Sequence, residues 1–77
     1  MNKERRKRLL EISDKLSDLL DDLEEVKEEE EEAFDNLPES LQDSTKGEQM
    51  YEIVETLYDI VADLEEARDS LQGAIEQ

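Results

Sequence analysis

The chain has 77 residues, 44% of them charged, and its 25 acidic residues against 9 Lys and Arg leave a formal net charge of −16. This length allows one domain, and the absence of Cys and His argues against zinc sites, disulfide frameworks and thiol or imidazole catalysis, so we expect neither an enzyme nor a metal or cofactor. No apolar run approaches the ~20 residues of a membrane span, and the basic start lacks the apolar segment of a secretion signal, so we expect a cytoplasmic protein without membrane contact.

Helix one is predicted over about residues 3–36, because apolar residues recur at alternating steps of three and four. This heptad spacing is typical of a helix that packs along one face against another helix. Glu30 is the one polar residue in the series. The apolar members are Leu9, Ile12, Leu16, Leu19, Leu23, Val26, Ala33 and Leu37.

A loop containing a short helical turn is predicted over about residues 37–44. Pro38 disfavours helical geometry at Leu37, so helix one should end near Asn36. Thr45 and Glu48 have the spacing of a capping box, which predicts the start of helix two at Thr45.

Helix two is predicted over about residues 45–76, with a heptad series of its own. The series comprises Met50, Ile53, Leu57, Ile60, Leu64, Ala67, Leu71 and Ala74. Matched helix lengths and a short connection favour one all-α domain over residues 1–77, an antiparallel two-helix hairpin. A second apolar column widens the apolar arc and favours a homodimer in which two hairpins form a four-helix bundle. We expect this column to be the dimer or partner interface, and it comprises Tyr51, Val54, Tyr58 and Val61.

The strongest functional signal is an acidic stripe on the side of helix one that faces away from the predicted seam. Ordinary exposed helices mix charge signs, because like charges four residues apart destabilise a helix by a few tenths of a kcal/mol. Four such stripes on a bundle would give one charge per ~1.3 Å, close to the ~1.7 Å of duplex DNA. The stripe comprises Glu11, Asp14, Asp18, Asp21, Glu25, Glu28, Glu32 and Asp35, and Glu52, Glu55 and Asp59 repeat the pattern on helix two.

Two further charged segments have simpler explanations. The run Glu28–Glu32 invites a metal site, but its side chains radiate around the helix and lack the spacing of a calcium loop, so we expect none. The basic segment Lys3–Arg8 is either an arm for nucleic acid or a membrane surface, or a neighbour of the acidic end of helix two. We favour the second reading, because so short an arm cannot offset the acidic body.

The loop segment Asn36-Leu-Pro-Glu-Ser-Leu-Gln-Asp-Ser-Thr-Lys-Gly-Glu-Gln-Met50, after a basic start and a Glu-rich helix, resembles short acidic helical proteins encoded by bacteriophages and prophages. That group has no assigned activity to carry over. The resemblance implies a bacterial host and a genomic setting in which small acidic proteins antagonise host nucleases, restriction enzymes or CRISPR effectors by imitating DNA.

The leading hypothesis is therefore a non-enzymatic nucleic-acid mimic that occupies the basic DNA- or RNA-binding surface of a host defence protein and does not itself bind nucleic acid. The simplest alternative is that the stripe is only the solvated outside of a bundle. Two others are an assembly module that docks a partner helix through the Tyr51 column, and unselective binding of basic proteins.

Overall fold

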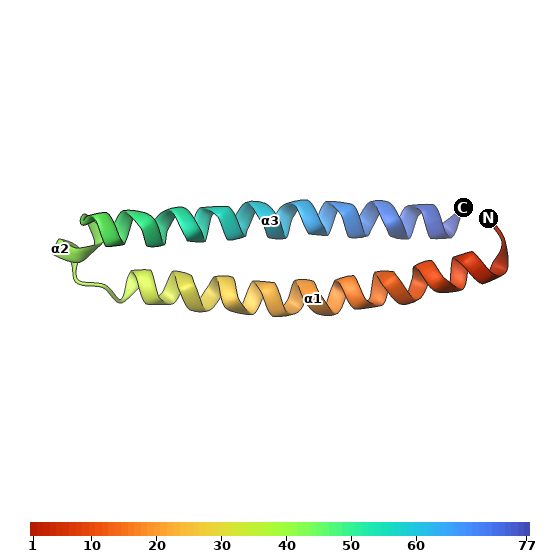
Figure 1. Ribbon diagram of the computed structural model, residues 1–77, viewed down its shortest axis with the longest axis horizontal. Coiled ribbons are helices and arrows are strands. Elements are labelled where there is room, and N and C mark those ends of the chain that lie inside the picture. Colours follow the sequence, from red (N-terminus) through yellow and green to blue (C-terminus); the bar gives the residue numbers. More distant parts are fainter.

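The chain folds into two long helices joined by a short connection. The computed structural model describes residues 1–77 and contains α1 (Lys3–Asp35), α2 (Glu39–Gln42) and α3 (Thr45–Glu76). The all-α class predicted from the apolar periodicity is confirmed. Figure 1 shows α1 and α3 side by side and antiparallel, with both chain termini at one end and α2 at the other.

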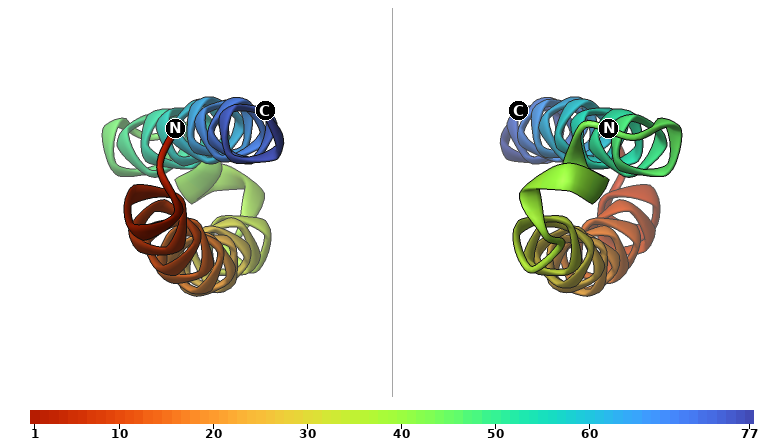
Figure 2. Two further views of the ribbon diagram at one scale, coloured as in Figure 1. Left: turned by 90° about the vertical axis from the view of Figure 1, so that its right-hand side faces the viewer. Right: turned by 90° about the vertical axis from the view of Figure 1, so that its left-hand side faces the viewer.

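The molecule is a rod. Its Cα extents are 58 × 15 × 13 Å, and its radius of gyration is 17.4 Å, against about 11.5 Å for a compact domain of this length. Viewed from the ends, the two helices are inclined to each other and cross along their length (Figure 2), as heptad-spaced helices do. Neither long helix contains an apolar stretch of the length that a membrane span requires.

Both ends of α1 are capped by amide side chains. At its start, Oδ1 of Asn2 accepts a hydrogen bond from the backbone N–H of Arg5 at 2.8 Å, which satisfies one of the unpaired N–H groups of the first turn. At its end, Nε2 of Gln42 donates to the carbonyl oxygens of Phe34, Asp35 and Leu37 at 3.3, 3.4 and 3.0 Å. Gln42 therefore ties the connection to the last turn of α1.

The start of α3 differs from the expected capping box. Thr45 is the first helical residue, and Ser44 is the N-cap, whose side chain accepts from the backbone N–H of Gly47 at 3.3 Å. The prediction that Thr45 and Glu48 form the cap was wrong by one position. Gly47 is buried, because the preceding turn, at Leu41 and Gln42, passes directly over its Cα.

Two columns of residues on each helix pack between α1 and α3. Within each column the residues recur every seven positions. The column Leu9, Leu16, Leu23 on α1 and the column Met50, Leu57, Leu64, Leu71 on α3 are half-buried, as predicted. The second inner column is not the predicted one. It comprises Arg6, Ser13, Leu20, Lys27 and Phe34 on α1, and Gly47, Val54, Val61, Arg68 and Ile75 on α3.

The residues that were expected to complete the seam are exposed instead. Leu19 is 62% exposed, and Ile12, Val26, Ile53 and Ile60 are 40–52% exposed. We call this set, with the small residues that continue it, the apolar flank. It comprises Ile12, Leu19, Val26 and Ala33 of α1, and Ile53, Ile60, Ala67 and Ala74 of α3.

Candidate functional site

The acidic stripe of α1 lies on the outer side of the helix, away from α3. The inner columns of α1 recur at residues 6, 13, 20 and 9, 16, 23, and positions one and five residues after the first of these columns point outward on a helix of 3.6 residues per turn. The structure brings all eight predicted carboxylates together there, and all are exposed. We call this surface the acidic face. It comprises Glu11, Asp14, Asp18, Asp21, Glu25, Glu28, Glu32 and Asp35.

The carboxylates of α3 make a second, less regular acidic surface. Glu52, Glu55 and Asp59 are exposed and lie at the positions of α3 that correspond to the acidic face of α1. Ala62 and Gly73 interrupt the series further along. The two helices are antiparallel, so the regular acidic stretch of α1 and that of α3 overlap at the end of the rod that carries the connection.

Almost none of the carboxylates forms an ion pair within the chain. The only ion pair joins Nε of Arg68 to Oδ1 of Asp69 at 3.4 Å, and it lies outside the acidic face. Lys27 has no carboxylate partner, and its ammonium lies 4.1 Å from the ring centroid of Tyr58. No group of three or more Asp and Glu side chains is arranged to hold a metal ion. The acidic face is therefore available to an external cation or a basic surface.

The column proposed as a dimer or partner interface is used only in part within the chain, because Tyr51 and Tyr58 remain 51% and 46% exposed. Val54 and Val61 are 6% and 5% exposed because they pack between α1 and α3. The ring of Tyr51 lies 5.7 Å from that of Phe34, and the hydroxyl of Tyr58 donates to Oε2 of Glu31 at 2.7 Å. The two valines present nothing to a partner, and both tyrosines contact α1 by one side.

The pKa of Tyr58 is raised because its neutral hydroxyl donates to Glu31, with smaller contributions from desolvation and from the charges of Glu31, Glu28 and Asp35. The raised pKa in the folded state means that this contribution to stability is complete below about pH 10 and is lost as the pH rises through the folded pKa. We expect Tyr58→Phe to flatten the fall of the unfolding midpoint between pH 9 and 12.

Urea unfolding of the two proteins, followed by circular dichroism at several pH values, checks this expectation. Tyr51, whose pKa Glu55 raises by hydrogen bonding and charge, remains in both proteins and contributes equally to both curves. A difference between the two midpoints that stays constant from pH 8 to 12 would contradict the role of Tyr58.

The basic segment at the N-terminus forms the first turns of α1. Lys3 is the first helical residue, and Figure 1 shows this end of α1 next to the C-terminal end of α3. None of these cations forms an ion pair with Asp69 or Glu76. The guanidinium of Arg6 is half-buried, and its Nε has no hydrogen-bond partner.

The apolar flank is the feature whose role the sequence reasoning missed. A second apolar column was recognised on helix two, but on both helices the more apolar series was assigned to the seam. A usable signal was present in the heptad pattern itself, because Ser13 and Gly47 supply the small side chains that a close approach of two helices requires. With these residues inside, Leu19 and Ile60 have to lie outside.

No protein-family model matches the chain, and comparisons with curated proteins and with solved structures found none that is similar.

Proposed function

We propose that this chain is a non-enzymatic acidic binding protein, encoded by a bacteriophage or prophage, that imitates nucleic acid. Its acidic face occupies the basic DNA- or RNA-binding surface of a host defence protein, such as a nuclease or a CRISPR effector. The resemblance of the Asn36–Met50 loop to phage-encoded acidic proteins supplies the setting, and the acidic face supplies the mechanism.

The observation that carries the proposal is the run of eight exposed carboxylates of α1 with no cation of the chain in an ion pair with any of them. Such a stripe destabilises its own helix, because neighbouring like charges repel by a few tenths of a kcal/mol each. A solvated helix gains the same solubility from mixed charges at lower cost. A basic groove that neutralises the stripe removes the repulsion and releases counterions, which makes binding favourable and strongly salt-dependent.

The proposal includes a helical hairpin as the folded unit and its self-association into a four-helix bundle. One chain buries only 5 of its 77 residues, and small domains with so little core usually gain stability from a partner. Pairing two hairpins would set several acidic stripes around one rod, which brings the charge density close to that of a duplex.

The test is capture of proteins from a bacterial lysate on the immobilised chain, followed by elution with duplex DNA and then with a salt gradient. We expect DNA- or RNA-binding proteins to be released by the duplex. In the variant Asp14→Lys/Asp18→Lys/Asp21→Lys, we expect the affinity for the captured target to fall on the order of 100-fold or more, because like charges would face each other.

The control variant is Glu39→Lys/Asp43→Lys/Asp63→Lys, which changes the net charge equally with exposed residues outside the acidic face. We expect it to retain most of the affinity. Equal losses in the two variants, with helicity retained, would show that only net charge matters. A captured protein that stays bound during elution with both the duplex and high salt would contradict the mimicry and favour an apolar docking surface.

A further inference from the structure

The apolar flank forms one continuous side of the rod. On the other side, Tyr58 of α3 meets Glu31 of α1, and each of these residues directly follows an inner position of its helix. Each flank residue comes directly before a residue of the second inner column and three residues after a residue of the half-buried column. On a helix, these positions lie on the other side of the seam from Tyr58 and Glu31. The flank columns of α1 and α3 therefore share one side.

The two flank columns themselves lack the negative charge that dominates the rest of the chain. Neither flank column contains a carboxylate, and the charged residues that continue the columns are Arg5 and Lys46. The chain carries a net charge of −16, so two copies can approach closely only through a surface that lacks this charge. The apolar flank meets that condition, and the acidic face does not.

The exposed area leaves room for a second copy. The chain exposes 5933 Å², whereas a monomeric protein of this mass typically exposes about 4,900 Å². The excess is about 1,000 Å², which is close to the ~800 Å² that each partner buries in a specific interface of standard size. A second copy on the apolar flank would cover this excess.

The charges that border the flank on α1 favour an antiparallel arrangement of two copies. They recur every seven residues as Arg8, Lys15, Asp22 and Glu29, and all four are exposed. The first two charges are positive and the last two are negative. Two antiparallel copies of α1 would therefore place Arg8 against Glu29 and Lys15 against Asp22.

The apolar residues of α1 have nearly the same centre, which is Leu19, whereas the centre of the charges lies midway between residues 18 and 19. With Leu19 on the two-fold axis, Ile12 of one copy would meet Val26 of the other, and Arg5 would meet Ala33. On α3, small residues near the same level, such as Ala67, allow close approach of the two copies.

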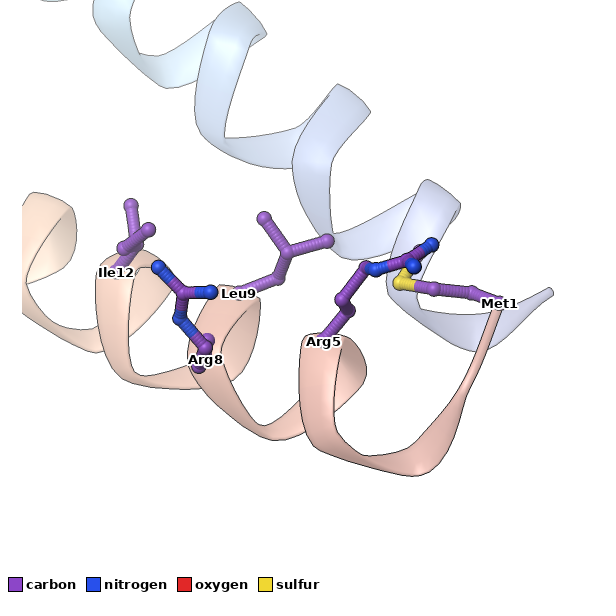
Figure 3. Close-up of a pocket in the computed structure, with 5 residues that line it drawn as sticks. All are labelled: Met1, Arg5, Arg8, Leu9 and Ile12. Atoms are coloured by element: carbon purple, nitrogen blue, oxygen red, sulfur yellow. The ribbon is translucent and has the colours of Figure 1, made fainter.

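Figure 3 shows one end of this surface, where Leu9 and Ile12 lie side by side on α1 beside Arg8. They line a shallow hollow with Met1 and Arg5, which Val26 and Glu29 of the second copy would fill.

From these observations we propose that a second copy of the chain docks on the apolar flank, with α1 against α1, antiparallel, and the two connections at opposite ends of the bundle. The reverse arrangement, with α1 against α3 of the second copy, is disfavoured by charge. Phe34 lies opposite Tyr51 within one chain, which puts Asp22 and Asp63 at one level, so that arrangement would bring these two carboxylates together.

The inference specifies the self-association within the proposed function and does not depend on the acidic face. Sedimentation equilibrium at tens of micromolar is the first test. We expect a dimer for the natural chain and a monomer of 9.0 kDa for Leu19→Glu, whose dissociation constant should rise on the order of 100-fold or more because two carboxylates would meet at the axis. Leu10→Glu is the matched control, because Leu10 is 51% exposed on the opposite side, and it should remain dimeric.

A natural chain that is monomeric at 100 µM, or a dimer that Leu10→Glu disrupts and Leu19→Glu does not, would overturn the inference. This result would leave the proposed nucleic-acid mimicry open, because the charge-reversal variants of the acidic face test it separately. Circular dichroism on both variants separates loss of association from loss of helices.

Cysteine cross-linking tests the orientation, since the natural chain has no cysteine. Oxidation of Leu19→Cys should give a disulfide-linked dimer quickly, because the two sulfurs would meet at the axis, whereas Leu10→Cys should cross-link slowly. The antiparallel α1 pairing is wrong if Leu19→Cys cross-links no faster than Leu10→Cys, while the double variant Leu19→Cys/Ala67→Cys cross-links faster than Leu10→Cys.

Discussion

Gly47→Ala should unfold the chain at markedly lower urea, with a loss of about 2–3 kcal/mol in the free energy of unfolding. A Cβ at this position would overlap the backbone carbonyl oxygens of Leu41 and Gln42. Backbone atoms cannot rotate away as a side chain can, so the turn before α3 would have to move. The move would also strain the hydrogen bond from Gly47 to Ser44 and the contacts of Gln42 with the end of α1.

Gly73→Ala is the matched control, because both glycines lie in α3 and a Cβ at Gly73 would meet nothing within 4 Å. Alanine favours helix over glycine by about 0.5–1 kcal/mol, so this variant should gain stability. Urea unfolding followed by circular dichroism at one protein concentration measures both changes. A Gly47→Ala variant as stable as the natural chain would show that the turn does not pass over Gly47.

Leu20→Ala should cost about 2–5 kcal/mol, the range found when a large buried side chain is truncated. Leu20 is 2% exposed and belongs to the short list of buried apolar residues, which includes Val54 and Val61. With so few such residues, removing one takes away a large share of the core. The same urea experiment should show a lower midpoint at every protein concentration.

Leu19→Ala provides the comparison at the neighbouring position. Leu19 is 62% exposed, so within one chain its truncation should cost less than about 1 kcal/mol. If a second copy covers Leu19, the loss grows with protein concentration as the dimer becomes populated. A larger concentration-independent loss at Leu19 than at Leu20 would mean that Leu19, and not Leu20, faces α3.

The sequence predicts the helical class, and it places the helix ends close to those of the structure, because proline and the polar loop residues act locally. The exposure of the acidic face is also predictable, since a carboxylate stripe cannot be buried without partners. The choice between the two apolar columns is not. Either column forms a heptad seam together with Leu9, Leu16 and Leu23, so periodicity alone does not decide between them.

Tertiary packing makes that choice. The inner column of α1 includes Ser13 and Lys27, which a ranking by hydrophobicity would place outside. Ser13 is small enough for close approach of α3, and the ammonium of Lys27 stacks on Tyr58. Contacts of this kind, like the three hydrogen bonds from Gln42, join residues far apart in the sequence or depend on the exact path of the turn. Apart from the small side chains at Ser13 and Gly47, a single sequence carries no signal for them.

The length of the acidic face along α1 limits which targets the proposed mimic can block. From Glu11 to Asp35 the face extends over about 36 Å at the ~1.5 Å rise of a helix, and one turn of duplex DNA has almost the same length, ~34–36 Å or about ten base pairs. A single helix therefore presents a footprint as long as one duplex turn. Proteins whose basic track holds one such turn are the targets this footprint fits, whereas readers of only a few nucleotides would leave most of its charge unmatched.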